Sequence, residues 1–389
     1  MSVSSFLFPM LYTIFLWWFG TGIILLLNQR PRSTHQATFW MSGMVLLFAL
    51  VGLKTSANLN TVAGAYCGFT CALLVWAWQE IGFLLGYVTG SRRTPCPPDC
   101  RGVRKAFYAF QTIFHHELAL IVLGIAVAIA TWGGSNLVGL WTFLILLAGP
   151  MVCATSQAIN DWFDRHVDAI NEPNRPIPSG RMPGRWGLYI AIIWTGLSLL
   201  VGWWISPWAF VATLIGLLLA WAYSAPPLRL KQNGWWGNAA CGLSYEGLAW
   251  FTGSAVMLGD AFPSVASIIL ALLYSIGAHG IMTLNDFKAI EGDRQMGVRS
   301  LPVQLGINGA AWNACLMMIV PQYLVVGFLH WHGSSFHALA ILVLIIAQLL
   351  MMKYFLEDPV KRALFLSGFG VPLFVSGMMI SAFAVGRLA

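Results

Sequence analysis

The sequence predicts an all-α membrane protein that crosses the bilayer many times, and three observations support this prediction. The chain of 389 residues is 58% hydrophobic and only 9% charged, and it contains 19 Trp and 24 Phe. Nearly every segment between polar breaks is an apolar run of roughly 18 to 25 residues, the length that a helix needs to cross a bilayer. The basic residues gather in alternate breaks, as they do when cytoplasmic loops collect Lys and Arg.

About twelve apolar runs are long enough to span the membrane, with ends fixed to within a few residues. The first basic residue is Arg30, so no positively charged segment precedes the first run and we expect no cleavable signal peptide. The predicted spans are residues 5–27, 38–55, 61–90, 117–133, 137–160, 186–205, 207–224, 236–258, 264–286, 309–330, 336–356 and 364–386.

The basic residues also predict the orientation of these spans. Of the 21 Lys and Arg residues, 19 follow an odd-numbered span, and only Lys54 and Arg387 fall on the other side. Because basic loops are the cytoplasmic ones, we expect both termini to face away from the cytoplasm. The same placement accounts for the net charge of +7, which therefore gives no argument for nucleic-acid binding.

A polar break at residues 91–116 predicts a domain boundary. It separates a three-helix appendage, residues 1–116, from a nine-helix domain, residues 117–389. Cys96 and Cys100 lie in this break as a lone CxxxC pair, which is weak evidence for a metal site or a disulfide. The other five cysteines lie in apolar runs, where we expect them to pack as small side chains.

Two acidic stretches contrast with this apolar background. Residues 160–181 (NDWFDRHVDAINEPNRPIPSGR) and residues 285–294 (NDFKAIEGDR) each begin with Asn-Asp at the predicted cytoplasmic end of a span. In a chain so poor in charge, this concentration predicts a binding site. Together the stretches hold seven of the 14 acidic residues: Asp161, Asp164, Asp168, Glu172, Asp286, Glu291 and Asp293.

The spacing of these acids indicates a site for cations. Asp161, Asp164 and Asp168 are spaced i, i+3 and i+7, which predicts one side of a helix, and Asp286 and Asp293 repeat the i, i+7 spacing. Two carboxylates about 4 Å apart repel by about 1 kcal/mol in water and about 4 kcal/mol at a membrane boundary. Oxygen-rich sites of this kind suit Mg²⁺, which also bridges to substrate phosphates.

Basic side chains follow the acids on the same predicted face of the membrane. Arg175 and Arg181 lie in the proline-rich segment NRPIPSGR, and Arg229 and Lys231 lie in YSAPPLRLK. A planar guanidinium offers paired donors that suit phosphate. Carboxylates, a divalent metal and arginines beside an apolar chamber predict a site for a diphosphate attached to a long hydrocarbon.

Simpler interpretations exist for each group. The acids could form solvated helix ends that pair with Arg165, Arg175 and Lys288, and the loop arginines could reflect membrane topology alone. The occurrence of two motifs, each opening with Asn-Asp at a predicted cytoplasmic helix end, favours the metal site.

At these residues the chain resembles the UbiA-type intramembrane prenyltransferases. Asn160, Asp161, Asp164 and Asp168 match the first motif of that family, NDxxDxxxD. Over about residues 147–389, the segments INDWFDRHVDAINEPNRPIPSGR, YSAPPLRLKQNGWWGN and NDFKAIEGDRQMGVRSLPVQLG are most similar to the chlorophyll and bacteriochlorophyll synthases of the family. The second motif departs from the commoner DxxDxxxD pattern, because Ala289 occupies the position of its middle acid.

The resemblance implies a helical bundle with a central chamber. It also implies Mg²⁺-dependent transfer of a geranylgeranyl or phytyl group from its diphosphate to the propionate carboxylate of a (bacterio)chlorophyllide. Catalysis would use Asp161, Asp164, Asp168 and Tyr223, and the ring of Tyr223 would either face the allylic cation or anchor its helix at the interface. The implied metal ligands are Asn160, Asp161, Asp164, Asp168, Asp286, Glu291 and Asp293. The implied diphosphate ligands are Arg165, Arg175, Arg181, Arg229, Lys231, Lys288 and Arg294.

Two further polar residues lie within apolar runs. Glu246 is the only acid in spans six to eight, and an intramembrane carboxylate is costly and often functional. His279 is interpreted as a packed or hydrogen-bonded histidine rather than as a ligand of the magnesium in a pigment.

Residues 1–146 resemble a different protein, the amino-terminal part of the photosynthetic complex assembly protein PuhE. The segments CPPDCRG and HHELALIVLGIAVAIATWGGSNLVGLWTFLILL carry this resemblance, which gives way to that of the synthases near Leu147. It implies a bacterial inner or photosynthetic membrane, with membrane lipid and photosynthetic assembly proteins as partners. Several alternatives stay open: geranylgeranyl or phytyl as donor, chlorophyllide or bacteriochlorophyllide as acceptor, a quinone precursor or haem as a different acceptor, and a non-catalytic assembly factor.

Overall fold

The computed structural model describes residues 4–259 and 261–386, and every element named in it is a helix. Eleven helices in this part of the chain are long and apolar enough to cross a membrane. The all-α, multi-pass fold is therefore confirmed. The predicted span at 236–258 is helical from Gly234 to Leu258, but a π turn at Leu243–Leu248 divides it into pieces too short to count among the eleven. Such turns often mark functional positions, and Glu246 lies within this one.

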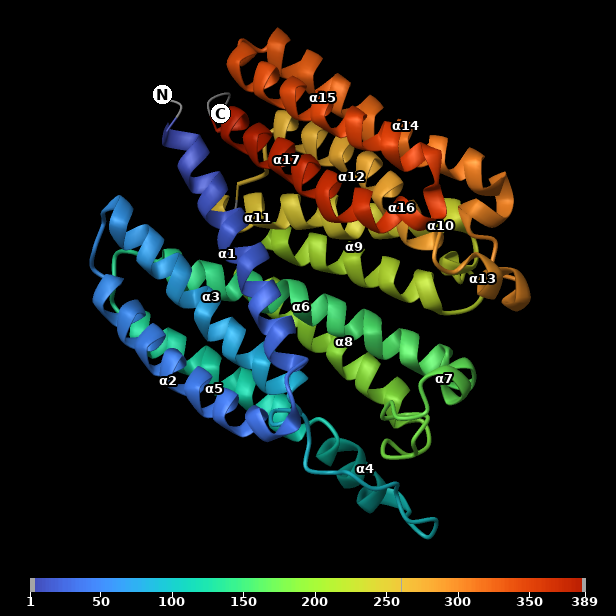
Figure 1. The fold of residues 1–389 in the computed structure, drawn as a ribbon. Helices are drawn as coiled ribbons and strands as arrows, with labels where there is room; N and C mark the ends of the chain where they lie inside the picture. The colour runs from blue at the N-terminus through green and yellow to red at the C-terminus, as the bar shows by residue number, and fades with distance from the viewer. Residues whose placement is uncertain (1–3, 260, 387–389) are drawn as a thin grey trace. The chain divides into compact units, whose positions relative to one another are not determined.

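The chain folds as two compact units, which are described separately (Figure 1). The N-unit comprises Leu11–Ser198, and the C-unit comprises Leu199–Ala389 together with Met1–Met10. The boundary predicted after residue 116 and the orientation predicted from the basic residues stay predictions. Arg387, which entered that orientation, lies outside the described residues.

The N-unit consists of long apolar helices and two short polar ones. The first residues of α1, up to Met10, and the last residues of α8, from Leu199, are assigned to the C-unit. The helices are α1 (Ser4–Asn28), α2 (Arg32–Ser56), α3 (Val62–Leu84), α4 (Gly102–Gln111), α5 (Phe114–Thr131), α6 (Val138–Phe163), α7 (Arg165–Asn171) and α8 (Trp186–Ile205).

Four of these helices share one apolar core. α2, α3, α5 and α6 each contribute a side chain that is at most 1% exposed, namely Leu53, Val75, Val127 and Phe143. Small residues allow close approach, because a Cβ at Gly139 of α6 would lie 2.4 Å from the Leu53 side chain. The core therefore joins helices from both sides of the polar break at 91–116.

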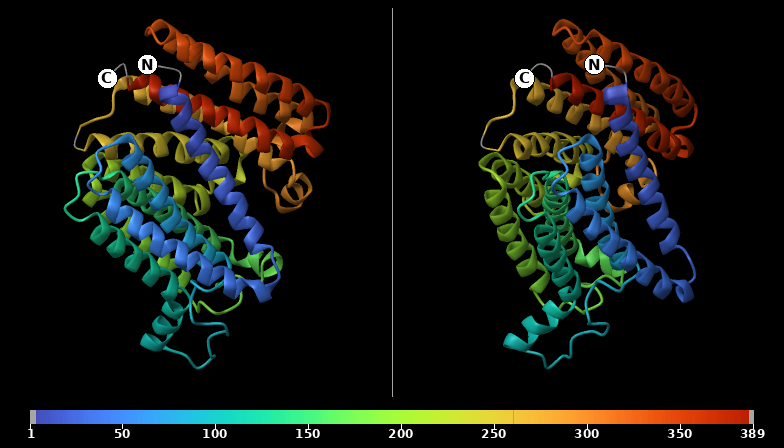
Figure 2. Two further views of the ribbon diagram at one scale, coloured as in Figure 1. Left: turned by 60° about the vertical axis from the view of Figure 1, so that its left-hand side comes forward. Right: turned by 90° about the vertical axis from the view of Figure 1, so that its left-hand side faces the viewer.

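The C-unit consists of helices joined by short turns. Two of its segments, η2 and η3, are π turns that continue directly into the neighbouring helices. In both views of Figure 2, α14 and α15 run side by side as a long hairpin. The elements are α9 (Pro207–Ser224), η1 (Leu230–Gln232), α10 (Gly234–Gly242), η2 (Leu243–Leu248), α11 (Ala249–Leu258), α12 (Val265–Asp286), α13 (Ile290–Met296), α14 (Leu301–Trp331), α15 (Ser335–Glu357), α16 (Pro359–Phe365), η3 (Leu366–Gly370) and α17 (Val371–Val385).

α12 is the most enclosed of the candidate spans, with 56% of its apolar stretch buried. It packs against α10, α14 and α17. Glycine permits this, since a Cβ at Gly280 would lie 2.4 Å from the Ala314 carbonyl oxygen on α14. The hydroxyls of Tyr274 and Ser381 link α12 to α17 at 2.8 Å, and such interhelical bonds contribute about 0.6 kcal/mol each. The second acidic motif begins at the end of this firmly held helix.

Candidate active site

The first acidic motif lies at a break between two helices. α6 ends at Phe163, and Asp164 (φ −98°, ψ 4°) joins it to α7. The prediction that Asp161, Asp164 and Asp168 share one side of a single helix is therefore wrong. Arg165 provides a physical reason, because its Nη1 donates to the Trp162 carbonyl at 2.7 Å and its guanidinium lies 4.3 Å from the Trp162 ring. A basic side chain that takes one of the last carbonyls of a helix caps it there.

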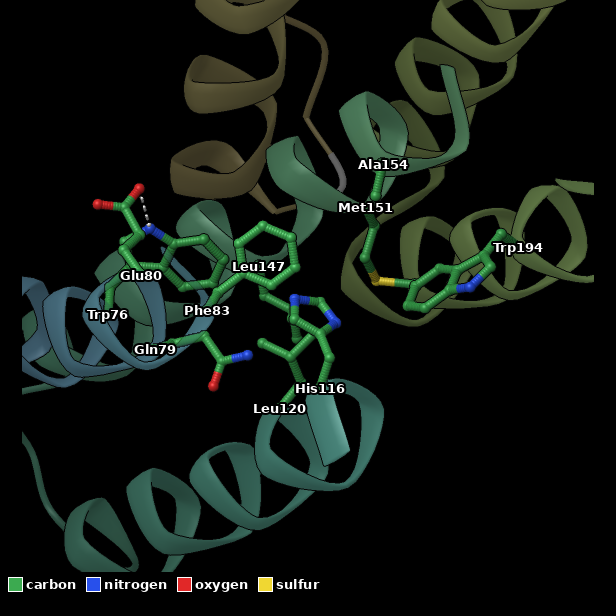
Figure 3. Close-up of a pocket in the computed structure, with 10 residues that line it drawn as sticks. All are labelled: Trp76, Gln79, Glu80, Phe83, His116, Leu120, Leu147, Met151, Ala154 and Trp194. Atoms are coloured by element: carbon green, nitrogen blue, oxygen red, sulfur yellow. Dashed lines mark hydrogen bonds between the residues drawn. The ribbon is translucent and has the colours of Figure 1, made fainter. Parts of the chain in front are cut away.

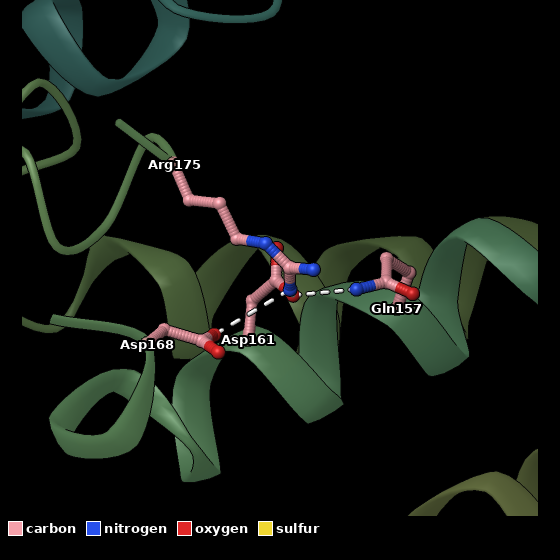
Figure 4. Close-up of polar contacts among 4 residues, drawn as sticks. All are labelled: Gln157, Asp161, Asp168 and Arg175. Atoms are coloured by element: carbon pink, nitrogen blue, oxygen red, sulfur yellow. Dashed lines mark hydrogen bonds and ion pairs between the residues drawn. The ribbon is translucent and has the colours of Figure 1, made fainter. Parts of the chain in front are cut away.

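Despite the break, two of the three aspartates converge on one arginine (Figure 4). Nη1 of Arg175 lies 2.8 Å from a carboxylate oxygen of Asp161 and 3.5 Å from one of Asp168. Gln157, one turn before Asp161, donates to the same Asp161 oxygen at 2.6 Å. Asp168 is 9% exposed. The proline-rich loop therefore folds back over the motif and places a guanidinium between its carboxylates.

The rest of this loop is held by its own polar groups and by the polar break at 91–116. Arg181 donates from Nε to Ser179 Oγ at 3.0 Å and from Nη2 to the Asn174 carbonyl. The backbone N–H of Cys96 donates to the Gly180 carbonyl at 3.0 Å. Gly180 has a φ of 72°, a conformation that favours glycine. The contact between these two loops was not predicted, because nothing in either segment alone indicates it.

The second acidic motif gathers a different set of groups in the C-unit. Asp286, the last residue of α12, accepts a hydrogen bond from Nδ2 of Asn238 on α10 at 3.3 Å. Asp293 on α13 is close enough to interact electrostatically with Asp286. Glu291 instead accepts from Gln295 at 3.1 Å. Of the three predicted ligands, the structure brings Asp286 and Asp293 together and directs Glu291 elsewhere.

A basic turn is tied to the segment that follows this motif. Arg229 adopts a left-handed backbone conformation (φ 38°) just before η1, and Lys231 lies within η1. The backbone of Arg299 donates to the Gln232 carbonyl at 2.9 Å and accepts from Gly234 at 2.8 Å. Arg229 and Lys231 are therefore fixed beside the end of the second motif. Non-glycine residues with positive φ are uncommon and occur often at functional sites.

Tyr223 lies near the same carboxylate. The Cys241 thiol and the Asp286 carboxylate are both within electrostatic range of its phenol. Lys288 and Arg294 are both exposed. Nε2 of His279 lies 3.2 Å from the Trp235 carbonyl oxygen. That contact agrees with the interpretation of His279 as a hydrogen-bonded residue.

The two motifs belong to different units, Asp161 to Asp168 to the N-unit and Asp286 to Asp293 to the C-unit. Within residues 4–259 and 261–386, no group of three or more His, Cys, Asp or Glu side chains is arranged to hold a metal ion. The predicted metal site that combines both motifs stays a prediction.

Comparison with known proteins identifies the family. The profile described as "UbiA prenyltransferase family" matches residues 118–376, which is more than half of the chain. This chain belongs to the UbiA prenyltransferase family. The predicted resemblance is thereby confirmed, and the chain is an integral membrane prenyltransferase. A profile described only as a protein of unknown function (DUF3623) matches residues 3–162, so the two matches overlap over residues 118–162, which hold most of α5 and α6.

Individual relatives agree with this assignment. The bacteriochlorophyll synthase 33 kDa chain of Cereibacter sphaeroides is 55% identical over 265 residues, which cover 67% of this chain and 86% of the relative. An uncharacterised 30.4 kDa protein in the puhA 5' region of Rhodobacter capsulatus is 36% identical over 140 residues, 35% of this chain and 51% of that protein. A solved structure of digeranylgeranylglyceryl phosphate synthase is 24% identical with a TM-score of 0.52, covers 64% of this chain and 86% of that one, and supports the fold alone.

Asn238 is a site residue of this UbiA prenyltransferase that the sequence did not single out. It is 9% exposed, and its Nδ2 bonds both Asp286 and Thr283 Oγ1, each at 3.3 Å. A signal was available, because an asparagine in the apolar run after Gly234 is an intramembrane polar residue. We infer that Asn238 is a positioning residue that orients the Asp286 carboxylate.

Asn238→Ala is therefore expected to lower kcat about 10-fold, because second-layer partners of functional carboxylates are worth roughly 10- to 100-fold. The activity of the variant should also need a higher concentration of divalent cation for half-saturation. Asn313→Ala on α14 is the control, since Asn313 lies in another apolar run and contacts no motif acid in the described part of the chain. A lowered kcat with an unchanged cation requirement would assign Asn238 to helix packing instead.

Proposed function

We propose that this prenyltransferase esterifies the propionate carboxylate of a (bacterio)chlorophyllide with a geranylgeranyl or phytyl group taken from its diphosphate. The observation that carries the proposal is the 55% identity to a bacteriochlorophyll synthase chain over 86% of that chain. The arrangement of Arg175 over the first acidic motif supports it, because the motif presents acids and a phosphate-binding side chain in one place.

The residues of the two motifs fit Mg²⁺ in their chemistry. All the candidate ligands are oxygen donors, which magnesium prefers. Asp161 and Asp168 already gather around a cation, the Arg175 guanidinium. The first motif would supply Asp161, Asp164 and Asp168 as ligands, and the second motif would supply Asp286 and Asp293. When bound, Mg²⁺ would neutralise the diphosphate and make it a better leaving group.

The basic side chains hold the other half of the diphosphate. Arg175 can exchange one carboxylate contact for a phosphate oxygen, because its guanidinium carries five donors. Arg229 and Lys231, in and beside the turn that is tied to Arg299, would add further positive charge. As the carbon–oxygen bond to the diphosphate breaks, negative charge grows on the leaving group, and these cations stabilise it.

The prenyl carbon becomes cation-like while that bond breaks, and the propionate carboxylate of the pigment forms the new ester bond to it. The products are the esterified pigment and inorganic diphosphate. Tyr223, which lies within electrostatic range of Asp286, would stabilise the cation with the face of its ring. We place this site at the cytoplasmic face of a bacterial inner or photosynthetic membrane, with both termini on the other side, on the basis of the basic loops.

A direct assay tests the proposal. Membranes that contain the protein, supplied with bacteriochlorophyllide, geranylgeranyl diphosphate and Mg²⁺, are expected to form the esterified pigment, which is detected by chromatography. Chelation of divalent cations with EDTA should abolish the product, and added Mg²⁺ should restore it, because the acids alone would repel the diphosphate.

Parallel reactions separate the alternatives. Chlorophyllide, haem and a quinone precursor test the acceptor, and phytyl diphosphate tests the donor. Product with haem or the quinone precursor alone would assign another acceptor to the same chemistry. Pigment that copurifies without any Mg²⁺-dependent product, while a known synthase is active alongside, would favour a non-catalytic assembly factor, the alternative suggested by the match to the puhA-region protein.

A further inference from the structure

A cleft in the N-unit is lined by no residue of the first acidic motif. It comprises about 580 Å³ of empty space, including space open to solvent, between helices α3, α5, α6 and α8. Its lining is mostly apolar, and Trp76, Phe83 and Trp194 supply aromatic side chains to it. All of its lining residues belong to the N-unit. No part of the proposed reaction uses this space.

Gln79 is the first indication that the cleft takes a ligand. It is 2% exposed, lines the cleft, and neither its amide nitrogen nor its amide oxygen has a hydrogen-bond partner in the described part of the chain. Figure 3 shows this amide directed into the same space as the ring of His116. A buried amide within a membrane span costs free energy unless something pairs with it. A ligand with a polar group at its edge would supply that partner.

His116 is the second indication. Its ring lines the cleft with its centroid 5.2 Å from that of Phe83, and its Nδ1 lies 3.3 Å from a carboxylate oxygen of Glu117. When Nδ1 donates its proton to this carboxylate, Nε2 presents a lone pair. No hydrogen bond to Nε2 is formed within residues 4–259 and 261–386. A carboxylate behind an imidazole is the usual arrangement for a histidine that ligates a metal.

A second, apolar groove adjoins this cleft. It lies between α4, α5 and α8, where Phe110, Ile121 and Ile190 line it, and Trp194 borders both spaces. Glu117, the partner of His116, lines the groove. A ligand could therefore place a flat aromatic head beside His116 and Gln79 and a long hydrocarbon tail along the groove.

From this geometry we propose that the N-unit binds an esterified magnesium tetrapyrrole. Nε2 of His116 is the axial ligand of its magnesium, Gln79 bonds a carbonyl at the edge of the ring, and the prenyl tail lies in the groove. The identity of the pigment rests on the proposed function, because such a molecule is the product of that reaction. The N-unit would thus hold the finished pigment rather than release it into the lipid.

Binding is tested with the full-length protein, freed of pigment and placed in lipid nanodiscs. The probes are bacteriochlorophyll a and its magnesium-free form, bacteriopheophytin a. Tryptophan fluorescence reports affinity, and the visible absorption band reports axial ligation of the magnesium. His116→Leu is expected to weaken binding of bacteriochlorophyll a at least about 10-fold and to remove the ligation signal. Gln79→Leu should weaken binding about 3- to 10-fold and leave that signal in place.

Two further variants serve as controls for specificity and for folding. His115→Leu changes the neighbouring histidine, which is exposed and does not line the cleft, and it should bind as the native protein does. His116→Gly should lose the ligation signal and regain it when imidazole is added, which shows that the fold is intact. The proposal would be overturned if the native and His116→Leu proteins bound bacteriochlorophyll a with equal affinity. It would also be overturned if His115→Leu lost as much affinity as His116→Leu, or if bacteriochlorophyll a and bacteriopheophytin a bound equally well.

The pigment site and the enzyme activity can fail separately. His116→Leu should esterify within about 2-fold of the native rate, because His116 is not part of the reaction site, and the inactive Asp164→Ala protein should still bind bacteriochlorophyll a through His116. Binding that depends on His116 in a protein without esterification would sustain the pigment site and remove the proposed activity. Normal esterification together with pigment binding that does not depend on His116 would sustain the proposed activity and remove the pigment site. Displacement of the pigment by an equal concentration of ubiquinone-10 would also overturn the proposal, in favour of a quinone.

Discussion

Asp164→Ala is expected to lower turnover by roughly 10²- to 10³-fold while the protein stays folded. The size follows from the loss of one ligand of the Mg²⁺ that would neutralise the leaving group, because removing one group that stabilises the developing charge costs about that much in other enzymes. The fold should survive, because Asp164 joins α6 to α7 through its backbone: its N–H bonds the Asn160 carbonyl at 2.8 Å and its carbonyl accepts from Asp168 at 2.9 Å. Alanine keeps both bonds. Single-turnover formation of the ester at saturating Mg²⁺ measures the effect.

Glu172 provides a control in the same segment. It is an exposed acid, four residues after Asp168, that belongs to neither predicted ligand set. Glu172→Ala should therefore keep turnover within about 2-fold of the native rate, since exposed surface charges contribute little. Folding of both variants is checked by thermal unfolding in detergent. Retention of turnover by Asp164→Ala would remove the metal role of the first motif.

The spans were predictable because their physical cause is local. Each residue of a membrane helix must satisfy its own backbone hydrogen bonds and face lipid or protein with an apolar side chain. The predicted spans 186–205 and 207–224 coincide with α8 and α9. The span at 236–258 shows the limit, because nothing in its hydropathy marks the π turn that contains Glu246.

The chemical identity of the site was predictable, but its geometry was not. The types and spacing of the acids and arginines indicated a site for a metal and a diphosphate. A regular helical spacing, however, placed Asp161, Asp164 and Asp168 on one helix, and the chain breaks at Asp164 instead. That break depends on a side-chain bond from Arg165 to a carbonyl, which competes with the helix and leaves no periodic signal.

Contacts between distant segments escaped sequence reasoning for a different reason. Asn238 meets Asp286 across 48 positions, and Cys96 meets Gly180 across 84. Such pairs form because helices place them together, and a single sequence does not encode which residues of two helices face each other. The contact of Cys96 with Gly180 joins the part of the chain that matches DUF3623 to the loop that carries Arg175.

Arg175→Gln is expected to raise KM for geranylgeranyl diphosphate by roughly 10- to 100-fold. A hydrogen bond to a charged group contributes about 1.5–3 kcal/mol, which corresponds to that range. The structure gives Arg175 a second role, since it holds Asp161 at 2.8 Å and Asp168 at 3.5 Å in the absence of substrate. Loss of this cation leaves neighbouring carboxylates without their partner, so the apparent affinity for Mg²⁺ should rise while that for the diphosphate falls.

Opposite changes in these two affinities separate ligand binding from a purely structural role. If Arg175 only anchored the loop, Arg175→Gln would loosen the motif and weaken Mg²⁺ and diphosphate together. Arg175→Lys should recover part of the affinity for diphosphate, because it keeps the charge but loses the planar paired donors. Arg185→Gln serves as the control, as Arg185 is an exposed arginine of the same loop outside the predicted set. Inhibition by inorganic diphosphate should weaken in parallel with KM, because the same guanidinium would hold substrate and product.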